Sequence, residues 1–184
     1  STGSGKSVFM NTLIASLLCK YQAKDLRFVM IDPKMVELAP YNKIPHMAMP
    51  VITDPQNEAK AALDALVEEM ENRYRNMKTL GVRNIAGYND MIKSSKKADY
   101  PDFKGKWSTI PYMVVIIDEL ADMMMILGKE AERPITSLAQ KARACGIHMV
   151  IATQRPSADV VTGLIKANFP TRISFRVSNA IDSR

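Results

Sequence analysis

The chain has 184 residues, 47% of them apolar, which is enough to bury the core of one domain and argues against general disorder. No apolar run approaches the roughly 18 residues of a membrane-spanning helix and no signal peptide opens the chain, so we expect a cytoplasmic domain. Residues 1–132 hold 17 basic and 17 acidic side chains, so the whole net charge of +6 lies in residues 133–184, as either a solvated face or a surface for polyphosphate.

The first seven residues match the last seven positions of the phosphate-loop pattern G-x-x-x-x-G-K-[ST]. Gly3 and Gly5 allow a tight turn that points backbone N–H groups at phosphate oxygens, next to the positive end of a helix. Lys6 would reach the β- and γ-phosphates, and the Ser7 hydroxyl would bind Mg²⁺. The first glycine of the pattern would be residue 0, so we expect a fragment that begins inside the loop. The nucleotide-binding residues that this motif predicts are Thr2, Gly3, Ser4, Gly5, Lys6, Ser7 and Val8.

Helical and strand-like patterns alternate along the rest of the chain, which predicts an α/β fold with a mostly parallel sheet and helices on both faces. The segment 94–108 is polar and rich in lysine, and it is expected to be an exposed loop whose lysines are solvated rather than bound to a phosphate backbone. We expect helices at 7–21, 57–80, 84–93, 122–127 and 130–144, a short one within 155–170, strands at 26–31, 113–117, 148–153 and 172–177, and irregular structure at 35–56.

An apolar run, Tyr112 to Ile117, ends in two carboxylates, Asp118 and Glu119. In open α/β sheets the carboxyl ends of the strands form the ligand-binding edge, so both side chains are expected there. Asp118 would orient Mg²⁺, and Glu119 would polarise the water that attacks the γ-phosphate. An acidic start to an ordinary helix is the plainer interpretation of the pair. Together with the phosphate loop, the pair indicates a nucleotide hydrolase.

Polar residues also follow the next predicted strand, where Thr153 and Gln154 could sense the γ-phosphate and hold the attacking water. The two cysteines, Cys19 and Cys145, lie far apart in apolar helical contexts and are expected to be reduced core thiols. His148 lies beside an apolar strand and is expected to be a core residue rather than a catalyst.

Several further segments make the pattern specific: IDPK at 31–34, LGVRN at 80–84, DELAD at 118–122, LAQKARACG at 138–146, ATQRPS at 152–157 and DVVTGLIKANFPTRI at 159–173. With the phosphate loop, these segments resemble the FtsK/SpoIIIE family of DNA translocases over almost the whole chain except the loop 94–108. The resemblance implies a RecA-like P-loop ATPase motor domain over 1–184. It also implies a hexameric ring around double-stranded DNA that uses ATP and Mg²⁺ to pump DNA during chromosome segregation at cell division or sporulation.

Family positions carry over residue by residue. Lys6 and Ser7 match Walker A, and Asp118 and Glu119 match Walker B. Arg143 matches an arginine finger that acts on a neighbouring subunit, so the expected catalytic residues are Glu119, Arg143 and Gln154. DNA-binding positions on or near the channel loops are Arg155, Lys166 and Arg184. Relatives often carry a lysine where this chain has Ala180, which leaves one such contact open.

Two other functions remain open at this point. The same core could drive protein secretion or conjugation, with a polypeptide or single-stranded DNA as its load. A nucleotide-gated assembly protein would bind ATP without hydrolysing it, although the presence of Glu119 argues against this. A parent protein would carry any DNA-sequence reader, or any anchor to the cell membrane or division septum, outside this chain.

Overall fold

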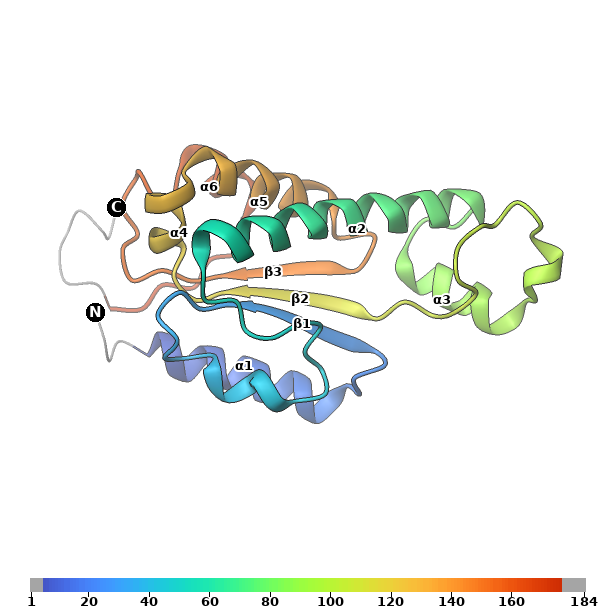
Figure 1. Cartoon of the computed structure of the whole chain (residues 1–184), viewed down its shortest axis with the longest axis horizontal. Helices are drawn as coiled ribbons and strands as arrows, with labels where there is room; N and C mark the ends of the chain where they lie inside the picture. Colours follow the sequence, from blue (N-terminus) through green and yellow to red (C-terminus); the bar gives the residue numbers. More distant parts are fainter. Residues whose placement is uncertain (1–4, 177–184) are drawn as a thin grey trace.

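A three-stranded parallel sheet organises the chain in the computed structural model, which describes residues 5–176 (Figure 1). The strands β1 (Leu26–Ile31), β2 (Tyr112–Ile117) and β3 (Ile147–Ile151) lie in the order β1-β2-β3. The register pairs Ile31 with Ile117 and Ile117 with Ile151, so all three carboxyl ends meet at one edge. The predicted α/β fold with a parallel sheet is confirmed.

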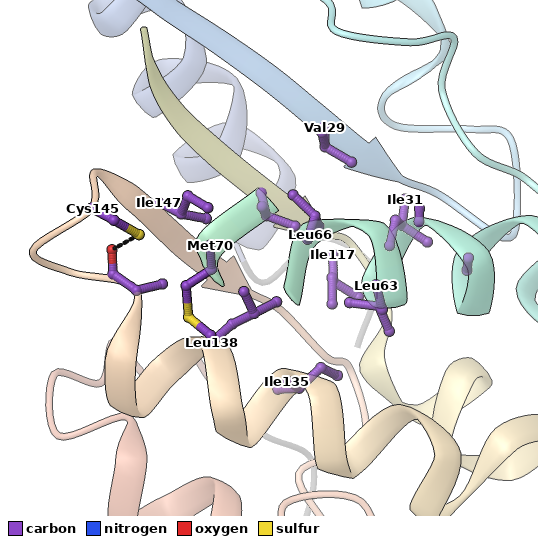
Figure 2. Close-up of a cluster of buried hydrophobic side chains, with 14 of the residues drawn as sticks. Val29, Ile31, Leu63, Leu66, Met70, Ile117, Ile135, Leu138, Cys145 and Ile147 are labelled. Carbon is purple, nitrogen blue, oxygen red and sulfur yellow. Dashed lines mark hydrogen bonds between the residues drawn. The ribbon is translucent and has the colours of Figure 1, made fainter. Parts of the chain in front are cut away.

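Helices cover both faces of this sheet, as the continuous apolar strands predict. On one face lies α1 (Lys6–Lys20), and on the other lie α2 (Lys60–Thr79) and α5 (Lys129–Lys141) (Figure 1). Successive strand residues alternate between two apolar clusters because side chains of a strand point to opposite faces. Figure 2 shows the α2/α5 cluster, with Val29, Ile31, Leu63, Leu66, Met70, Ile117, Ile135, Leu138, Cys145 and Ile147. The α1 cluster is made by Met10, Ile14, Leu26, Phe28, Met30, Leu38, Val51, Val114 and Ile116.

The shorter elements lie close to their predicted positions. Asn84 caps α3 by accepting a hydrogen bond from the Gly87 N–H, and Asp54 caps the turn that leads into α2. Residues 35–56, expected to be irregular, contain one short 3₁₀ turn and lie partly alongside β1, through isolated bridges at Met47 and Ile52. The remaining bounds are Ala39–Lys43 for the 3₁₀ turn, Pro55–Ala59 for a π turn before α2, Ile85–Ser94 for α3, Lys97–Asp99 for a second 3₁₀ turn, Leu120–Leu127 for α4 and Gly163–Asn168 for α6.

The lysine-rich segment 94–108 is fixed to the domain by aromatic side chains. Phe103 is only 2% exposed, and its ring centroid lies 6.4 Å from that of Tyr88 and 5.6 Å from that of Trp107. The lysines of the segment remain exposed. Packing of the rings therefore gives this loop a defined conformation with its charges directed to solvent.

Three predictions are wrong. The strand expected at 172–177 does not form over residues 172–176, because this stretch has no ladder partner among the described residues. Its Phe175 packs instead against Phe9, at 5.9 Å between ring centroids. His148 is exposed and stacks on Tyr112, since its place in β3 lies near the amino end, beyond the helical cover. Cys19 is exposed near the end of α1, so Cys145 alone is a core thiol.

Candidate nucleotide site at the carboxyl edge of the sheet

The two predicted motifs meet at the carboxyl edge of the sheet. Gly5, with φ of 107°, precedes α1 in a left-handed conformation that glycine adopts readily, and α1 begins at Lys6. The Lys6 Nζ donates a hydrogen bond to the Asp118 backbone oxygen at 2.7 Å and lies 3.0 Å from the Asp118 Oδ1. Residues 112 positions apart in the sequence thus form a buried ion pair where β2 ends.

Asp118 carries a perturbed carboxyl group. Burial raises the pKa of Asp118 above its usual value, the nearby charges of Asp32 and Glu37 raise it further, and the Lys6 ammonium opposes the increase. Its Oδ1 is buried and faces the Lys6 ammonium at 3.0 Å. A buried carboxylate oxygen that faces a positive charge is a suitable ligand for a cation.

Ser7 and Glu37 complete the polar lining on the α1 side. The Ser7 Oγ donates a hydrogen bond to the Glu37 Oε1 at 2.6 Å. Glu37 is held in place because the fully buried Asp32 carboxylate accepts hydrogen bonds from the backbone of the loop 34–38, including the Glu37 N–H at 3.0 Å. The sequence analysis missed Glu37, because the Asp-Pro that follows β1 predicts only where the strand ends and not where the next loop lies.

Glu119 is buried, 2% exposed, and its carboxylate accepts several hydrogen bonds. It accepts from the Thr153 hydroxyl at 2.5 Å, from the Gln154 N–H at 3.0 and 3.2 Å, and from the Ala121 N–H at 3.3 Å, as the N-cap of α4. The contact to Gln154 uses its backbone rather than the side chain to which the sequence pattern drew attention. The loop after β3 therefore orients Glu119.

Lys34 brings a second positive charge to this edge. Its Nζ lies 3.4 Å from the Asp122 Oδ2 and 3.9 Å from the Glu119 Oε2, and its side chain is about half exposed. Of the other predicted nucleotide-binding residues, Val8 is 71% exposed in the first turn of α1. Thr2, Gly3 and Ser4 lie outside the described residues.

Arg143 lies at the opposite edge of the sheet. It follows α5 in the turn that leads into β3, and it is exposed. Because β3 runs from that turn toward Gln154, at least the length of this strand, about 15 Å, separates Arg143 from Glu119. The structure does not bring Arg143 to the nucleotide edge of its own chain.

The predicted DNA-binding residues are spread over the carboxyl-terminal part of the chain. Arg155 is exposed in the loop after β3, one residue beyond Gln154, and Lys166 is exposed on α6. The Lys166 backbone oxygen accepts a hydrogen bond from the Arg172 guanidinium at 2.5 Å, which fixes the end of α6. Arg184 lies outside the described residues.

No group of three or more His, Cys, Asp or Glu side chains in residues 5–176 is arranged to hold a metal. On the α1 side of the carboxyl edge, Ser7, Glu37 and Asp118 supply polar oxygens. Such a set is typical of Mg²⁺ sites in which nucleotide phosphates supply further ligands. No helix in the same part of the chain is both long and apolar enough to cross a bilayer.

Comparisons with known proteins agree with this geometry. The sequence model of the FtsK/SpoIIIE family matches residues 1–158. The chain is 50% identical over 203 aligned residues to the DNA translocase FtsK of Rickettsia typhi and 54% identical over 185 residues to that of Streptococcus pneumoniae. Both alignments cover 100% of this chain but only 27% and 23% of the relatives, so the chain spans about a quarter of their length.

A solved structure shares the fold. The chain is similar to the monomeric form of the pCW3 conjugation coupling protein TcpA with ATPγS, with a TM-score of 0.70 and 31% sequence identity. The similarity covers 92% of this chain and 45% of that one. The protein in that structure holds a nucleotide analogue, which agrees with a P-loop ATPase fold here.

Proposed function

Since this chain belongs to the FtsK/SpoIIIE family, we propose that it is the ATP-hydrolysing motor domain of a protein that moves double-stranded DNA. The observation that carries the proposal is the buried pair of Lys6 and Asp118, with 3.0 Å between the ammonium and the carboxylate, beside the oriented Glu119. A phosphate-binding lysine, a metal-binding carboxylate and a general base at one sheet edge form the minimal apparatus for cleaving a γ-phosphate.

Each residue of this edge has a distinct task. Lys6 exchanges its contact with Asp118 for the β- and γ-phosphates, whose several negative charges attract an ammonium more strongly than one carboxylate does. Glu119 orients the attacking water and takes its proton. The Thr153 hydroxyl and the Gln154 N–H fix the direction of the Glu119 carboxylate, so the base does not have to be ordered during the reaction.

The oxygens of Ser7 and Asp118 would hold Mg²⁺, with Glu37 beside them. When bound, Mg²⁺ supplies charge neutralisation for the β- and γ-phosphates. The buried Asp118 Oδ1 supports this assignment, because a metal ion would replace the Lys6 ammonium as its positive partner when Lys6 turns to the phosphates.

Arg143 acts as a finger on the nucleotide of a neighbouring subunit. Its distance from the nucleotide edge of its own chain, about the length of a strand, supports action in trans. Hydrolysis would then require assembly, as expected for a hexameric ring. Arg155, Lys166 and Arg184 would contact the phosphate backbone without reading bases, so binding should weaken steeply with salt. The parent protein would work in the cytoplasm at the cell membrane or division septum, in chromosome segregation.

A second candidate is a conjugation motor, which the similarity to the coupling protein TcpA favours. The two functions differ in load. Steady-state ATP turnover by the full-length protein should rise several-fold with double-stranded DNA and much less with single-stranded DNA or unfolded polypeptide. Equal stimulation by single strands would favour conjugation, and no stimulation by any nucleic acid would refute the DNA motor.

The nucleotide assignment has its own control. Lys6→Ala should weaken ATP binding, measured by calorimetry, by roughly 100-fold, since it removes a charge-assisted contact to phosphate. Lys60→Ala, at an exposed lysine paired with Asp64, should bind ATP like the parent. Equal affinities for the two variants would contradict the phosphate-loop assignment.

A further inference from the structure

A basic cavity of about 840 Å³ opens at the amino edge of the sheet, opposite the nucleotide edge. It lies between the end of α2, the start of α3 and the turn from α5 into β3. We infer that this cavity is the second half of a composite nucleotide site. In it, Arg83 and Lys141 act with Arg143 on the phosphates of ATP bound to the neighbouring copy of this chain. The inference rests on the proposed function. The charged and aromatic side chains that line the cavity are Tyr74, Arg83, Tyr112, Lys141, Arg143 and His148.

The walls of the cavity are fixed by contacts between segments that lie far apart in the sequence. Arg73 is buried in α2 and donates a hydrogen bond to the Cys145 backbone oxygen at 3.0 Å, and the Tyr74 hydroxyl donates to the Lys141 backbone oxygen. The Ile85 N–H, in the first turn of α3, donates to the Ala144 oxygen at 2.9 Å. The turn that carries Arg143 is therefore held to both helices, so its basic residues are presented in a defined arrangement.

Gly146 allows the wall to close. It has φ of 77°, and a Cβ at this position would lie 2.5 Å from the Ile85 Cδ1 and 3.2 Å from the Tyr112 ring. Any other residue would be strained at this φ and would force the Ile85 side chain to move. Tyr112 in turn stacks on His148, with 6.1 Å between the ring centroids, and forms the floor where β2 and β3 begin. This close packing gives the wall and floor of the cavity a defined shape.

The charge of the cavity is unbalanced. Arg83, Lys141 and Arg143 are exposed, and none of them forms an ion pair with a carboxylate in residues 5–176. The lining contains no Asp or Glu. The amino-terminal end of α3, which begins at Ile85, also faces the cavity and adds its partial positive charge. Three unpaired cations around one concavity attract a multiply charged anion.

The position of the cavity identifies the source of that anion. The ATP phosphates of the same chain would lie at the other end of the strands, so they do not reach this cavity and its anion must come from another molecule, which we assign to the neighbouring copy in the ring. Contact between the amino edge of one copy and the carboxyl edge of the next is heterologous, and such contacts close into rings when the rotation permits. The neighbour's edge is complementary, because it presents the partly exposed Glu37 together with the nucleotide.

Arg83 and Lys141 therefore extend the finger site beyond Arg143. Their substitution should lower turnover without changing ATP binding to the subunit that carries it. We expect Arg83→Ala to reduce turnover by the full-length protein roughly 10- to 100-fold, as for loss of a charge-assisted contact to phosphate. The double variant Arg83→Ala/Lys141→Ala should be lower still, while Arg83→Lys should recover part of the activity. Arg133→Ala, at an exposed arginine on α5 outside the cavity, is the matched control and should behave like the parent.

A mixing experiment tests action in trans. A Lys6→Ala subunit lacks its phosphate lysine but keeps the basic cavity, whereas an Arg83→Ala/Lys141→Ala subunit keeps its nucleotide edge but lacks the cavity. Each preparation alone should be nearly inactive, and mixing should restore turnover where the intact edge meets the intact cavity. Failure of the mixture to exceed the sum of its parts would overturn the inference.

Assembly provides a readout that is independent of turnover. ATPγS should promote association of the parent in sedimentation velocity, and it should do so much less for Arg83→Ala/Lys141→Ala at equal protein concentration. Thermal melting identifies any loss of folding, in which case the single variant Arg83→Ala takes the place of the double variant in the mixture. If the parent shows ATP turnover stimulated by double-stranded DNA while the double variant retains full turnover and assembly, this inference falls and the proposed function stands. If the parent does not hydrolyse ATP, both fall.

Discussion

The two edges of the sheet differ in the burial and pairing of their charged side chains. At the carboxyl edge, charged groups are buried and paired within the chain: Lys6 with Asp118, and Glu119 with donors from the loop after β3. At the amino edge, Arg83, Lys141 and Arg143 are exposed around an open cavity and have no acidic partner in the described part of the chain.

This difference indicates which residues of the nucleotide site are positioned by contacts within a single chain. Buried charges must be satisfied inside the fold, because leaving one unpaired costs several kcal/mol. Exposed cations do not carry this free-energy cost, because water solvates them, so they remain available to bind an anion from another molecule. In the proposed assembly, the carboxyl edge is therefore complete within one chain, whereas the amino edge would acquire its function when a neighbour supplies the anion. Substitutions at the amino edge should therefore lower assembly-dependent ATP turnover while leaving ATP binding unchanged, unlike loss of Lys6 at the carboxyl edge.

The largest effect is expected for Arg143→Ala, at the open edge. ATP binding should persist, because Arg143 lies far from the nucleotide of its own chain, while turnover should fall about 10³-fold or more, as for loss of an arginine finger. Calorimetry and steady-state kinetics on the same preparation measure both quantities. Arg143→Lys keeps the charge but not the planar fork, and it should stay well below the parent. If Arg143→Ala hydrolysed ATP at the parental rate, the amino edge would have no role in turnover.

Glu119→Gln tests the closed edge itself. The variant keeps the size of the side chain and its place at the start of α4, so ATP affinity should change little. Loss of the general base should lower turnover roughly 10²- to 10⁴-fold. Asp122→Asn is the neighbouring control, since Asp122 contacts only the half-exposed Lys34 among the ion pairs at this edge. Similar turnover for the two variants would show that Glu119 is not the base.

A smaller effect should follow from Thr153, which acts through Glu119. Thr153→Val removes the hydroxyl that donates to the Glu119 carboxylate at 2.5 Å while preserving shape, and we expect turnover to change about tenfold. Thr153→Ser retains the donor and should restore the parental rate. The KM for ATP should be the same in both variants, since Thr153 positions the base and not the nucleotide. Identical rates for the valine and serine variants would argue against this positioning role.

The smallest effect concerns the stability of the nucleotide-free, Mg²⁺-free protein. Burial raises the pKa of Asp118, so its stabilising contribution is present at low pH and is lost as pH rises through the folded-state pKa. The Tm of Asp118→Asn minus that of the parent should therefore increase between about pH 4 and pH 7, by a few degrees.

Asp54 offers a control of opposite sign for this pH dependence. Hydrogen bonds from Asn57 lower the pKa of Asp54, so its contribution is present at neutral pH and is lost as pH falls. The Tm of Asp54→Asn minus that of the parent should therefore decrease as pH rises. Parallel trends for the two variants would contradict the assignment of burial as the cause at Asp118.

Local patterns made much of the fold predictable. The strand at 26–31 coincides with its predicted bounds, and the strands near 112 and 147 begin within one residue of theirs, because apolar runs ended by Asp or Gly identify buried strands without knowledge of their neighbours. Contacts between segments that lie far apart in the sequence were not predictable in the same way. A segment such as 172–176 has strand-like composition, but strand formation also requires a partner with free backbone groups.

The sequence by itself determined which residues are candidates for the nucleotide edge, since the glycines, Lys6 and the pair Asp118-Glu119 each lie in short motifs whose spacing is local. Only the tertiary structure decided that Glu37 meets Ser7, that Thr153 holds Glu119, and that Arg83 joins Arg143 around one cavity. These contacts join residues between 30 and 60 positions apart. Their formation depends on strand register and on the packing of loops, which no single segment of the sequence specifies.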